Sequence, residues 1–211
     1  MKGLFLKDWY LMKKYCRFLL LFVICFLVAG FAKKDEFFLM YSMLMVSIIP
    51  VTLLAYDEKS KWNIYSQTMP YTRRQIVSEK YLIMLALLGI VLVLICIGQY
   101  FITKTELSSD IWYYYTLRIQ TVVIIFSICI IMSSILLSVL FKFGIETGRM
   151  IYYIVFILTA IVANSIVTPD TNEVLPELIR KHMILTVFVI DILLIGISWW
   201  IAVRSYEKRR F

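Results

Sequence analysis

Six long stretches of the chain carry almost no charge, and this pattern constrains the fold more than any other feature. A membrane-spanning helix needs about 20 predominantly apolar residues. Five stretches reach that length, and the first can still span if Arg17 and Lys33 at its ends extend to the two interfaces. The sequence therefore predicts an all-α polytopic membrane protein with six transmembrane helices, at residues 18–32, 37–56, 81–103, 119–141, 150–169 and 183–203.

The composition of the 211 residues excludes the main alternatives. Apolar residues make up 62% of the chain and charged residues 17%, whereas a soluble domain carries about a quarter charged residues. The apolar stretches are too long for the strands of an outer-membrane barrel and lack its alternation of polar and apolar positions. We therefore expect residues 1–211 to form a single transmembrane domain.

Basic residues gather on one side of this predicted domain. Of the 22 lysines and arginines, 16 fall in the two terminal segments and in the connections 57–80 and 142–149. Because cytoplasmic connections are enriched in lysine and arginine, both termini are predicted to be cytoplasmic. This topology accounts for the net charge of +8 without nucleic acid as a partner.

The amino-terminal segment, residues 1–16, has the pattern of an amphipathic helix. At about 100° per residue, Phe5, Trp9 and Met12 share one side, and lysines occupy the other. We expect this helix to lie in the inner interface of the bilayer. Asp8 projects into the apolar side, so it either pairs with a cation from the first cytoplasmic loop or is a solvated residue that favours the helix dipole.

The first cytoplasmic loop, residues 57–80, is longer than a connection between two spans requires. Trp62, Tyr65 and Met69 recur at spacings of three and four, which predicts a short helix with one apolar edge. That edge must contact the membrane, the bundle or another protein. Anchoring of Trp62 and Tyr65 at the interface is the simpler alternative.

Local signals also mark the end of this short helix and the start of the next. Pro70 stops the first helix, because proline interrupts helical hydrogen bonding. Thr72 and Gln75 form a capping-box pattern, which predicts that a new helix begins there and runs into the third span.

Two stretches carry a more specific pattern. The first is Leu6-Lys7-Asp8 on the amphipathic helix, and the second reads TMPYTRRQIVSEKY at residues 68–81. Together they resemble the ABC-2-type permeases, the membrane subunits of bacterial ABC exporters. Met69 stands where that family usually has leucine. The six-span layout extends the resemblance over the whole chain, and short permeases of toxin-peptide exporters and antimicrobial-peptide resistance systems are the most similar group.

The resemblance implies a division of labour between chains. The amphipathic helix, with Asp8 and Trp9, would be an elbow helix, and the loop 57–80 would be a coupling segment that docks on a separate P-loop ATPase. Two permeases, identical or related, would pair with two ATPases in the bacterial plasma membrane and export a hydrophobic or amphipathic substrate such as a peptide or lipid. The residues implied in docking are Trp62, Tyr65, Ser66, Met69, Pro70, Arg73 and Arg74.

The sequence assigns no catalytic residue and no metal site to this chain. It lacks the G-x-x-x-x-G-K-[ST] pattern that cradles phosphates, so ATP and Mg²⁺ would bind the partner ATPase. Its one histidine, His182, belongs to no zinc motif, and its four cysteines show no pairing pattern. We therefore expect a membrane subunit without enzyme activity of its own.

Asp191 lies near the middle of the predicted last span, where an exposed charge would cost at least ~2.5 kcal/mol. It either belongs to the translocation pathway and attracts cationic substrate, or it is hydrogen-bonded to serine or threonine of a neighbouring helix. Ser127, Ser134 and Ser138 share one face of the fourth span, which favours close helix packing.

Two further alternatives concern the outer side and the function. The connection 168–182 is predicted either to form short gate helices, as is common in the family, or to be an ordinary solvated loop. A six-helix uptake component would usually show a polar ligand pocket built from outer loops. A non-transporting membrane protein, such as an immunity or assembly factor, would need no ATPase.

Overall fold

The computed structural model describes residues 2–33, 36–105, 111–144 and 183–208, together with Ile154 and Ile157. Every regular element within these ranges is helical, as the apolar stretches predicted. The elements are α1 (Lys2–Tyr15), α2 (Arg17–Lys33), α3 (Glu36–Lys59), α4 (Trp62–Tyr65), the 3₁₀ helix η1 (Ser66–Thr68), α5 (Arg73–Thr105), α6 (Ile111–Phe143) and α9 (Met183–Lys208).

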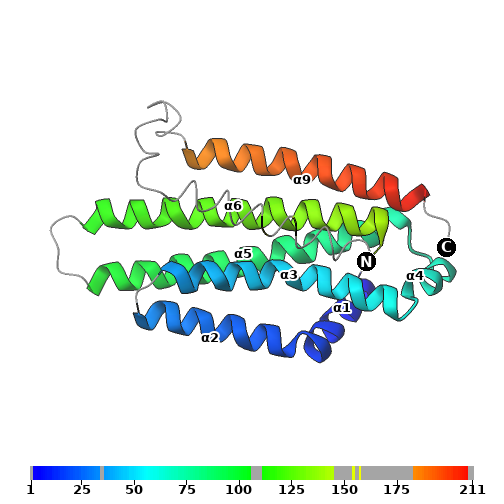
Figure 1. Cartoon of the computed structure of the whole chain (residues 1–211), viewed down its shortest axis with the longest axis horizontal. Helices are drawn as coiled ribbons and strands as arrows, with labels where there is room; N and C mark the ends of the chain where they lie inside the picture. Colours follow the sequence, from blue (N-terminus) through cyan, green and yellow to red (C-terminus); the bar gives the residue numbers. More distant parts are fainter. Residues whose placement is uncertain are drawn as a thin grey trace.

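The long helices run side by side in an elongated bundle (Figure 1). α3, α5 and α6 pack against one another, α2 covers α3 on one side, and α9 lies on α6 and α5 on the other. α1, the loop with α4 and the last turn of α9 lie at the same end of the bundle, which we call the α4 end. The first helix and the end of the last helix therefore lie at the same end of the bundle as the loop that the sequence singled out.

Among the described helices, four are long and apolar enough to cross a membrane, and they coincide with the second, third, fourth and sixth predicted spans. α2 coincides with the first predicted span, but it passes that test only when it is joined to α1 as one bent span. The predicted fifth span, 150–169, and the outer connection 168–182 lie outside the described residues, apart from Ile154 and Ile157. The four helices are Phe37–Lys59, Arg73–Phe101, Val122–Phe143 and Leu185–Lys208.

α1 and α2 are set at an angle of 75° to each other. Backbone hydrogen bonds continue across the bend, from Cys16 N to Met12 O at 3.0 Å and from Leu20 N to Cys16 O at 2.9 Å. Met12 and Cys16 are buried in one cluster with Ile49 and Leu53 of α3. Apolar packing against α3 therefore holds α1 in its bent orientation.

Close packing also joins α2 to α3 at the opposite end of the bundle. A Cβ atom added to Gly30 would lie only 2.7 Å from Leu39 Cδ2. Glycine is thus required for α2 to approach α3 this closely. The two helices follow each other directly in the chain, so this contact closes the first helical hairpin.

Candidate functional site

α1 presents two different sides at the α4 end. Leu4, Asp8 and Met12, spaced four residues apart, are 1%, 1% and 6% exposed, whereas Phe5 and Trp9 are 36% and 50% exposed. Residues four apart share one face of a helix, so Asp8 sits on the face that packs against the bundle. The predicted apolar side is therefore divided: Trp9 stays at the surface, and Asp8 faces protein.

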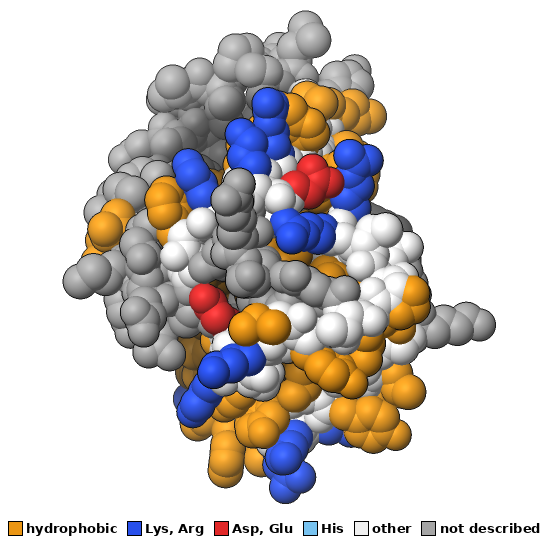
Figure 2. Space-filling view, turned by 90° about the vertical axis from the view of Figure 1, so that its right-hand side faces the viewer, with side chains coloured by type: hydrophobic (Ala, Val, Ile, Leu, Met, Phe, Trp, Pro, Cys, Tyr) orange, Lys and Arg blue, Asp and Glu red, His pale blue; other side chains and the backbone are white. Residues whose placement is uncertain are grey.

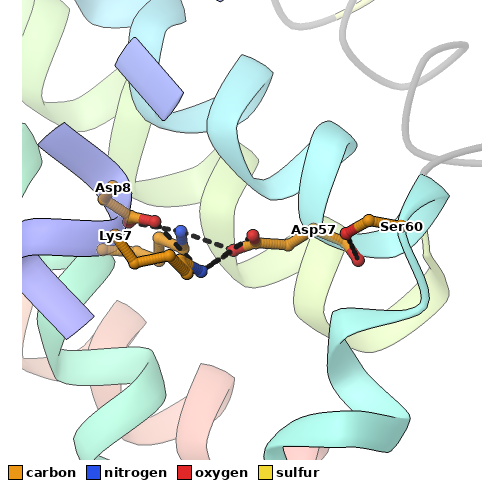
Figure 3. A network of polar contacts seen from close by, with 5 residues as sticks. Lys7, Asp8, Asp57 and Ser60 are labelled. Carbon is orange, nitrogen blue, oxygen red and sulfur yellow. Dashed lines mark hydrogen bonds and ion pairs between the residues drawn. The ribbon is translucent and has the colours of Figure 1, made fainter. Parts of the chain in front are cut away.

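Asp8 belongs to a buried network of four charged side chains from three helices (Figure 3). Lys80 Nζ of α5 lies 2.5 Å from Asp8 Oδ2 and 2.6 Å from Asp57 Oδ2, near the end of α3. Lys7 Nζ lies 3.0 Å from Asp8 Oδ1 and 2.8 Å from Asp57 Oδ1. Each lysine bridges both aspartates, and we call the four residues the ion cluster. The expected pairing of Asp8 with a cation of the loop 57–80 is confirmed, and Lys80 is that cation.

The ion cluster is nearly sealed from solvent. The side chains of Lys80, Asp8 and Asp57 are 0%, 1% and 3% exposed, and that of Lys7 is 19% exposed. Moving one charge into a protein interior costs several kcal/mol unless opposite charges and hydrogen bonds compensate it. Two positive and two negative groups in mutual contact provide that compensation. The cluster therefore joins α1, α3 and α5 only as a complete set.

Glu79 is a further carboxylate beside the ion cluster. It is 1% exposed, and neither of its carboxylate oxygens has a hydrogen-bond partner within the part of the chain that the structure describes. The charges acting on it are those of the ion cluster, two negative and two positive. If Glu79 is ionised, the five groups carry one more negative than positive charge. The neighbouring groups therefore provide no balancing positive charge for an ionised Glu79.

The loop after α3 closes over the ion cluster. Lys61 adopts a left-handed backbone conformation, with φ 55° and ψ 27°, which turns the chain directly from α3 into α4. The ring centroid of Trp62 lies 4.4 Å from Lys7 Nζ, a cation–π contact. Ile64 and Tyr65 are 55% and 57% exposed. α4 therefore has an inner edge on the ion cluster and an outer edge in solvent.

The short helix predicted around Trp62, Tyr65 and Met69 is smaller than expected. α4 ends at Tyr65, η1 follows, and Met69 is extended, with φ −97° and ψ 156°. The prediction that Met69 belongs to the same helical edge is wrong. The residue before a proline is pushed toward extended backbone, and Pro70 imposes that conformation on Met69.

The capping box predicted at the start of the next helix is confirmed. Thr72 N donates to Gln75 Oε1 at 3.1 Å, and Gln75 N donates to Thr72 Oγ1 at 3.3 Å. Two backbone N–H groups at the helix start are thereby satisfied. α5 begins at Arg73 and runs without interruption to Thr105.

The predicted docking residues of the loop do not all face the same way. Ser66 is 1% exposed, and Trp62 contacts the ion cluster, so both face the bundle. Tyr65 and Pro70 are exposed. Ile64, which the sequence did not single out, is exposed beside Tyr65. Spacing alone did not show which edge of such a short helix the bundle would cover.

The two arginines at the start of α5 contact the end of α9. Arg73 Nη1 donates to the backbone oxygens of Tyr206 at 3.3 Å and Glu207 at 2.7 Å. Carbonyl groups in the last turn of a helix lack partners within the helix, and Arg73 supplies one. Arg74 Nε lies 3.1 Å from Glu207 Oε1 in an exposed ion pair. Both arginines therefore join α5 to α9.

A second buried network, made of hydroxyl groups, begins at Tyr81, the residue of α5 that follows Lys80 of the ion cluster. Tyr81 Oη lies 2.8 Å from Ser198 Oγ and 3.1 Å from Ser138 Oγ. Ser198 Oγ donates to Ser134 O at 2.7 Å, and Ser138 Oγ donates to Ser198 O at 2.8 Å. We call Tyr81, Ser138 and Ser198 the hydroxyl cluster. It joins α5 to α6 and α9.

Asp191 is 3% exposed and faces α6. Ser127 Oγ donates to Asp191 Oδ1 at 2.6 Å. A hydrogen bond to a serine of a neighbouring helix, one of the two interpretations of Asp191, is therefore present. Ser134 and Ser138 on the same helix also lie at contacts with α9, in agreement with the predicted packing role of the serines.

Tyr81 and Ser198 were not indicated as partners by the sequence. A hydroxyl group inside a span can form hydrogen bonds with many different partners. Which partner it meets depends on how each helix is rotated about its axis. A sequence signal was available for the start of this helix. Ser78-Glu79-Lys80 directly precedes an apolar span, and polar side chains that are buried there require partners.

Comparison with known proteins identifies the chain over nearly its whole length. A family model described as ABC-2 family transporter protein matches residues 3–207. Neither the curated proteins nor the solved structures give a significant match. The matched range includes every residue of the ion cluster and of the hydroxyl cluster.

Proposed function

The chain belongs to the ABC-2 family of transporters, and we propose that it is the permease subunit of an ATP-driven exporter whose ATPase is a separate chain. ATP and Mg²⁺ bind that ATPase. A second permease, identical or related, completes the membrane unit. The substrate is hydrophobic or amphipathic, a peptide or a lipid, and the apolar composition of the bundle supports this class.

We place the α4 end of the bundle, with both termini, in the cytoplasm of a bacterial cell. Figure 2 views this end and shows lysine and arginine side chains spread across it, with few acidic side chains between them. Exposed basic residues here include Lys59, Lys61, Arg74 and Lys142. The enrichment of lysine and arginine in cytoplasmic connections supports this orientation.

The ion cluster is the observation that carries the proposed coupling. The coupling segment, residues 57–80, begins at Asp57 and ends at Lys80, and we call its part between α3 and α5, residues 60–72, the coupling loop. Because both aspartates contact Lys80 and Lys7, the two helices that flank the loop are bound to each other and to α1. A force on the loop therefore moves α1, α3 and α5 together, as a coupling segment requires.

The outer edge of α4 is the surface that we assign to ATPase docking. Ile64 and Tyr65 expose an apolar edge, and Lys59, Lys61 and Arg74 are exposed at the same end of the bundle. A tyrosine beside an apolar residue is typical of the centre of a protein interface. The complementary surface is an apolar groove with an acidic rim on the ATPase. Trp62 and Ser66 support this edge from inside.

The test is purification of the tagged chain in mild detergent, followed by an ATPase assay of the bound material. Wild type should retain a P-loop ATPase. The double variant Ile64→Ala with Tyr65→Ala should lose at least about tenfold of the bound ATPase, since two central contacts of this kind are each worth roughly 1–2 kcal/mol or more. The permease itself should remain folded, because both side chains are exposed.

A matched control replaces two exposed apolar residues on the spans, Phe18→Ala with Phe188→Ala, which are 76% and 59% exposed. This control should retain the ATPase. Retention by the Ile64 and Tyr65 double variant would refute the docking assignment. Absence of any ATPase from wild type would refute the exporter and favour the non-transporting membrane protein.

A further inference from the structure

Lys80 and Tyr81 are neighbours in α5 with opposite connections. Lys80 binds the two aspartates of α1 and α3, whereas Tyr81 binds the serines of α6 and α9. Successive residues of a helix point about 100° apart, so the ion cluster and the hydroxyl cluster occupy different sides of one turn. This turn of α5 joins α1 and α3 to α6 and α9.

Ser138 and Ser198 are hydrogen-bonded to each other between α6 and α9. Ser198 Oγ donates to Ser134 O at 2.7 Å, Ser138 Oγ donates to Ser198 O at 2.8 Å, and the two serine hydroxyl oxygens lie 2.7 Å apart. Tyr81 Oη lies within hydrogen-bond distance of both serine hydroxyls, and in each contact either oxygen can be the donor. α6 and α9 are therefore bound to each other without Tyr81, and Tyr81 adds α5 to the pair.

We propose that Tyr81 is the positioning residue that passes a displacement of the coupling loop from α5 to α6 and α9. The inference rests on the proposed function, because it presumes that an ATPase moves the loop. Lys80 binds α5 to α1 and α3, the helices beside the coupling loop. The buried hydroxyl group of Tyr81, the next residue, binds α5 to α6 and α9. Further contacts between α5 and α9 lie earlier on α5 and are more exposed: those of Arg73 and Arg74 with the end of α9, and the hydrogen bond that Trp199 Nε1 donates to Ser78 Oγ at 3.0 Å.

Tyr81→Phe removes this link with little other change. The ring remains, so the volume of the core is kept, and the hydrogen bonds between α6 and α9 keep their donors and acceptors. A role limited to stability would lower the melting temperature slightly and leave the response to nucleotide intact. A positioning role changes the response itself.

The experiment measures amide hydrogen–deuterium exchange of the complex with its ATPase in lipid nanodiscs, nucleotide-free and trapped with ATP and vanadate. In wild type, peptides covering residues 57–72 and residues 196–206 should both change exchange on trapping. In Tyr81→Phe, the loop peptide should keep its change, and the α9 peptide should lose at least half of its change. Tyr100→Phe, at the exposed far end of the same helix, is the control and should behave as wild type.

Three results overturn the inference, and they are distinguishable. An undiminished α9 response in Tyr81→Phe refutes the role of Tyr81 and leaves the proposed function intact. A lost α9 response in Tyr100→Phe as well shows that the effect is not specific to Tyr81. No loop response in wild type refutes the proposed coupling and, with it, the inference. If Tyr81→Phe does not assemble, Ser198→Ala is measured instead: it removes the closest partner of Tyr81 Oη together with the hydrogen bond to Ser134 O, and an undiminished α9 response in this variant refutes the role of Tyr81.

Discussion

The ion cluster and the hydroxyl cluster lie next to each other on α5 and are both buried, yet they hold their helices by different chemistry. Four charges in mutual contact tolerate no loss, because removing one partner strands a buried charge at a cost of about 3–5 kcal/mol. A neutral hydrogen bond contributes about 0.5–1.5 kcal/mol, and hydroxyl groups can exchange partners. Tyr81 Oη already has two serine oxygens within reach.

This difference indicates a rigid joint on one side of α5 and an adjustable contact on the other. The rigid joint unites the helices that flank the coupling loop with α1. The adjustable contact connects them to α6 and α9, which lie across the bundle. The proposed exporter needs both properties, since its coupling loop would move as a unit while the helices of the bundle change their packing.

The largest effect is expected from Lys80→Met. It leaves Asp8 and Asp57 facing each other with only Lys7 between them, so the free energy of unfolding should fall by about 3–5 kcal/mol. Thermal or denaturant unfolding in detergent measures the loss. Lys59→Met, an exposed lysine at the end of α3, should change stability by no more than about 0.5 kcal/mol.

The loss of stability in Lys80→Met is expected to come from the unbalanced charge, not from the missing lysine side chain itself. Adding Asp8→Asn to Lys80→Met removes one negative charge and leaves Lys7 paired with Asp57. The double variant should therefore recover a large part of the lost stability. Additive losses in the double variant would show that shape, not charge, holds the three helices together.

A smaller loss is expected from Ser198→Ala in the hydroxyl cluster. It removes the donor to Ser134 O and the closest partner of Tyr81 Oη, and the free energy of unfolding should fall by about 1–2 kcal/mol. Ser205→Ala on the same helix is the control. A loss as large as that of Lys80→Met would remove the distinction between the rigid and the adjustable side.

Glu79→Gln should raise the free energy of unfolding, in contrast to the two variants above. It replaces a carboxyl whose ionised form is disfavoured by burial and by the negative charges of Asp8 and Asp57, and whose oxygens no described donor satisfies, with a group that is always neutral. We expect unfolding to require up to about 1 kcal/mol more than in wild type. A clear destabilisation would mean that the charge of Glu79 belongs to the ion cluster, and that five groups rather than four form the joint.

The smallest effect on stability is expected from Asp191→Asn. The amide oxygen can still accept the hydrogen bond of Ser127, so the free energy of unfolding should stay within about 0.5 kcal/mol of wild type. The ATPase rate of the complex is the second measurement. A changed rate with unchanged stability would assign Asp191 to the translocation pathway, and two unchanged values would assign it to helix contact alone.

Much of this architecture could be predicted from local sequence. Four of the apolar stretches coincide with helices that could span a membrane, and the capping box at Thr72 and Gln75 forms as predicted. Asp8 was a usable signal because a carboxylate on an apolar helix side demands a partner. Its partner, Lys80, came from the predicted cytoplasmic loop 57–80.

Other features depended on contacts that no local pattern contains. The spacing of Trp62 and Tyr65 predicted that both lie on one docking edge, but Trp62 packs on Lys7 and is partly buried, whereas Ile64 and Tyr65 are exposed. Met69 left the helix because Pro70 follows it, although its spacing fitted. The pairing of Tyr81 with Ser198 joins residues 117 positions apart, and nothing in either neighbourhood specifies the other.

The sequence by itself determined that this chain is a helical membrane protein, where most of its described helices run, and that one loop and one carboxylate needed partners. Only the tertiary structure decided which partners they found. Hydropathy and capping act within a few residues and therefore appear in the sequence directly. The ion cluster and the hydroxyl cluster require each helix to be rotated correctly against its neighbours, and that rotation exists only once the bundle is packed.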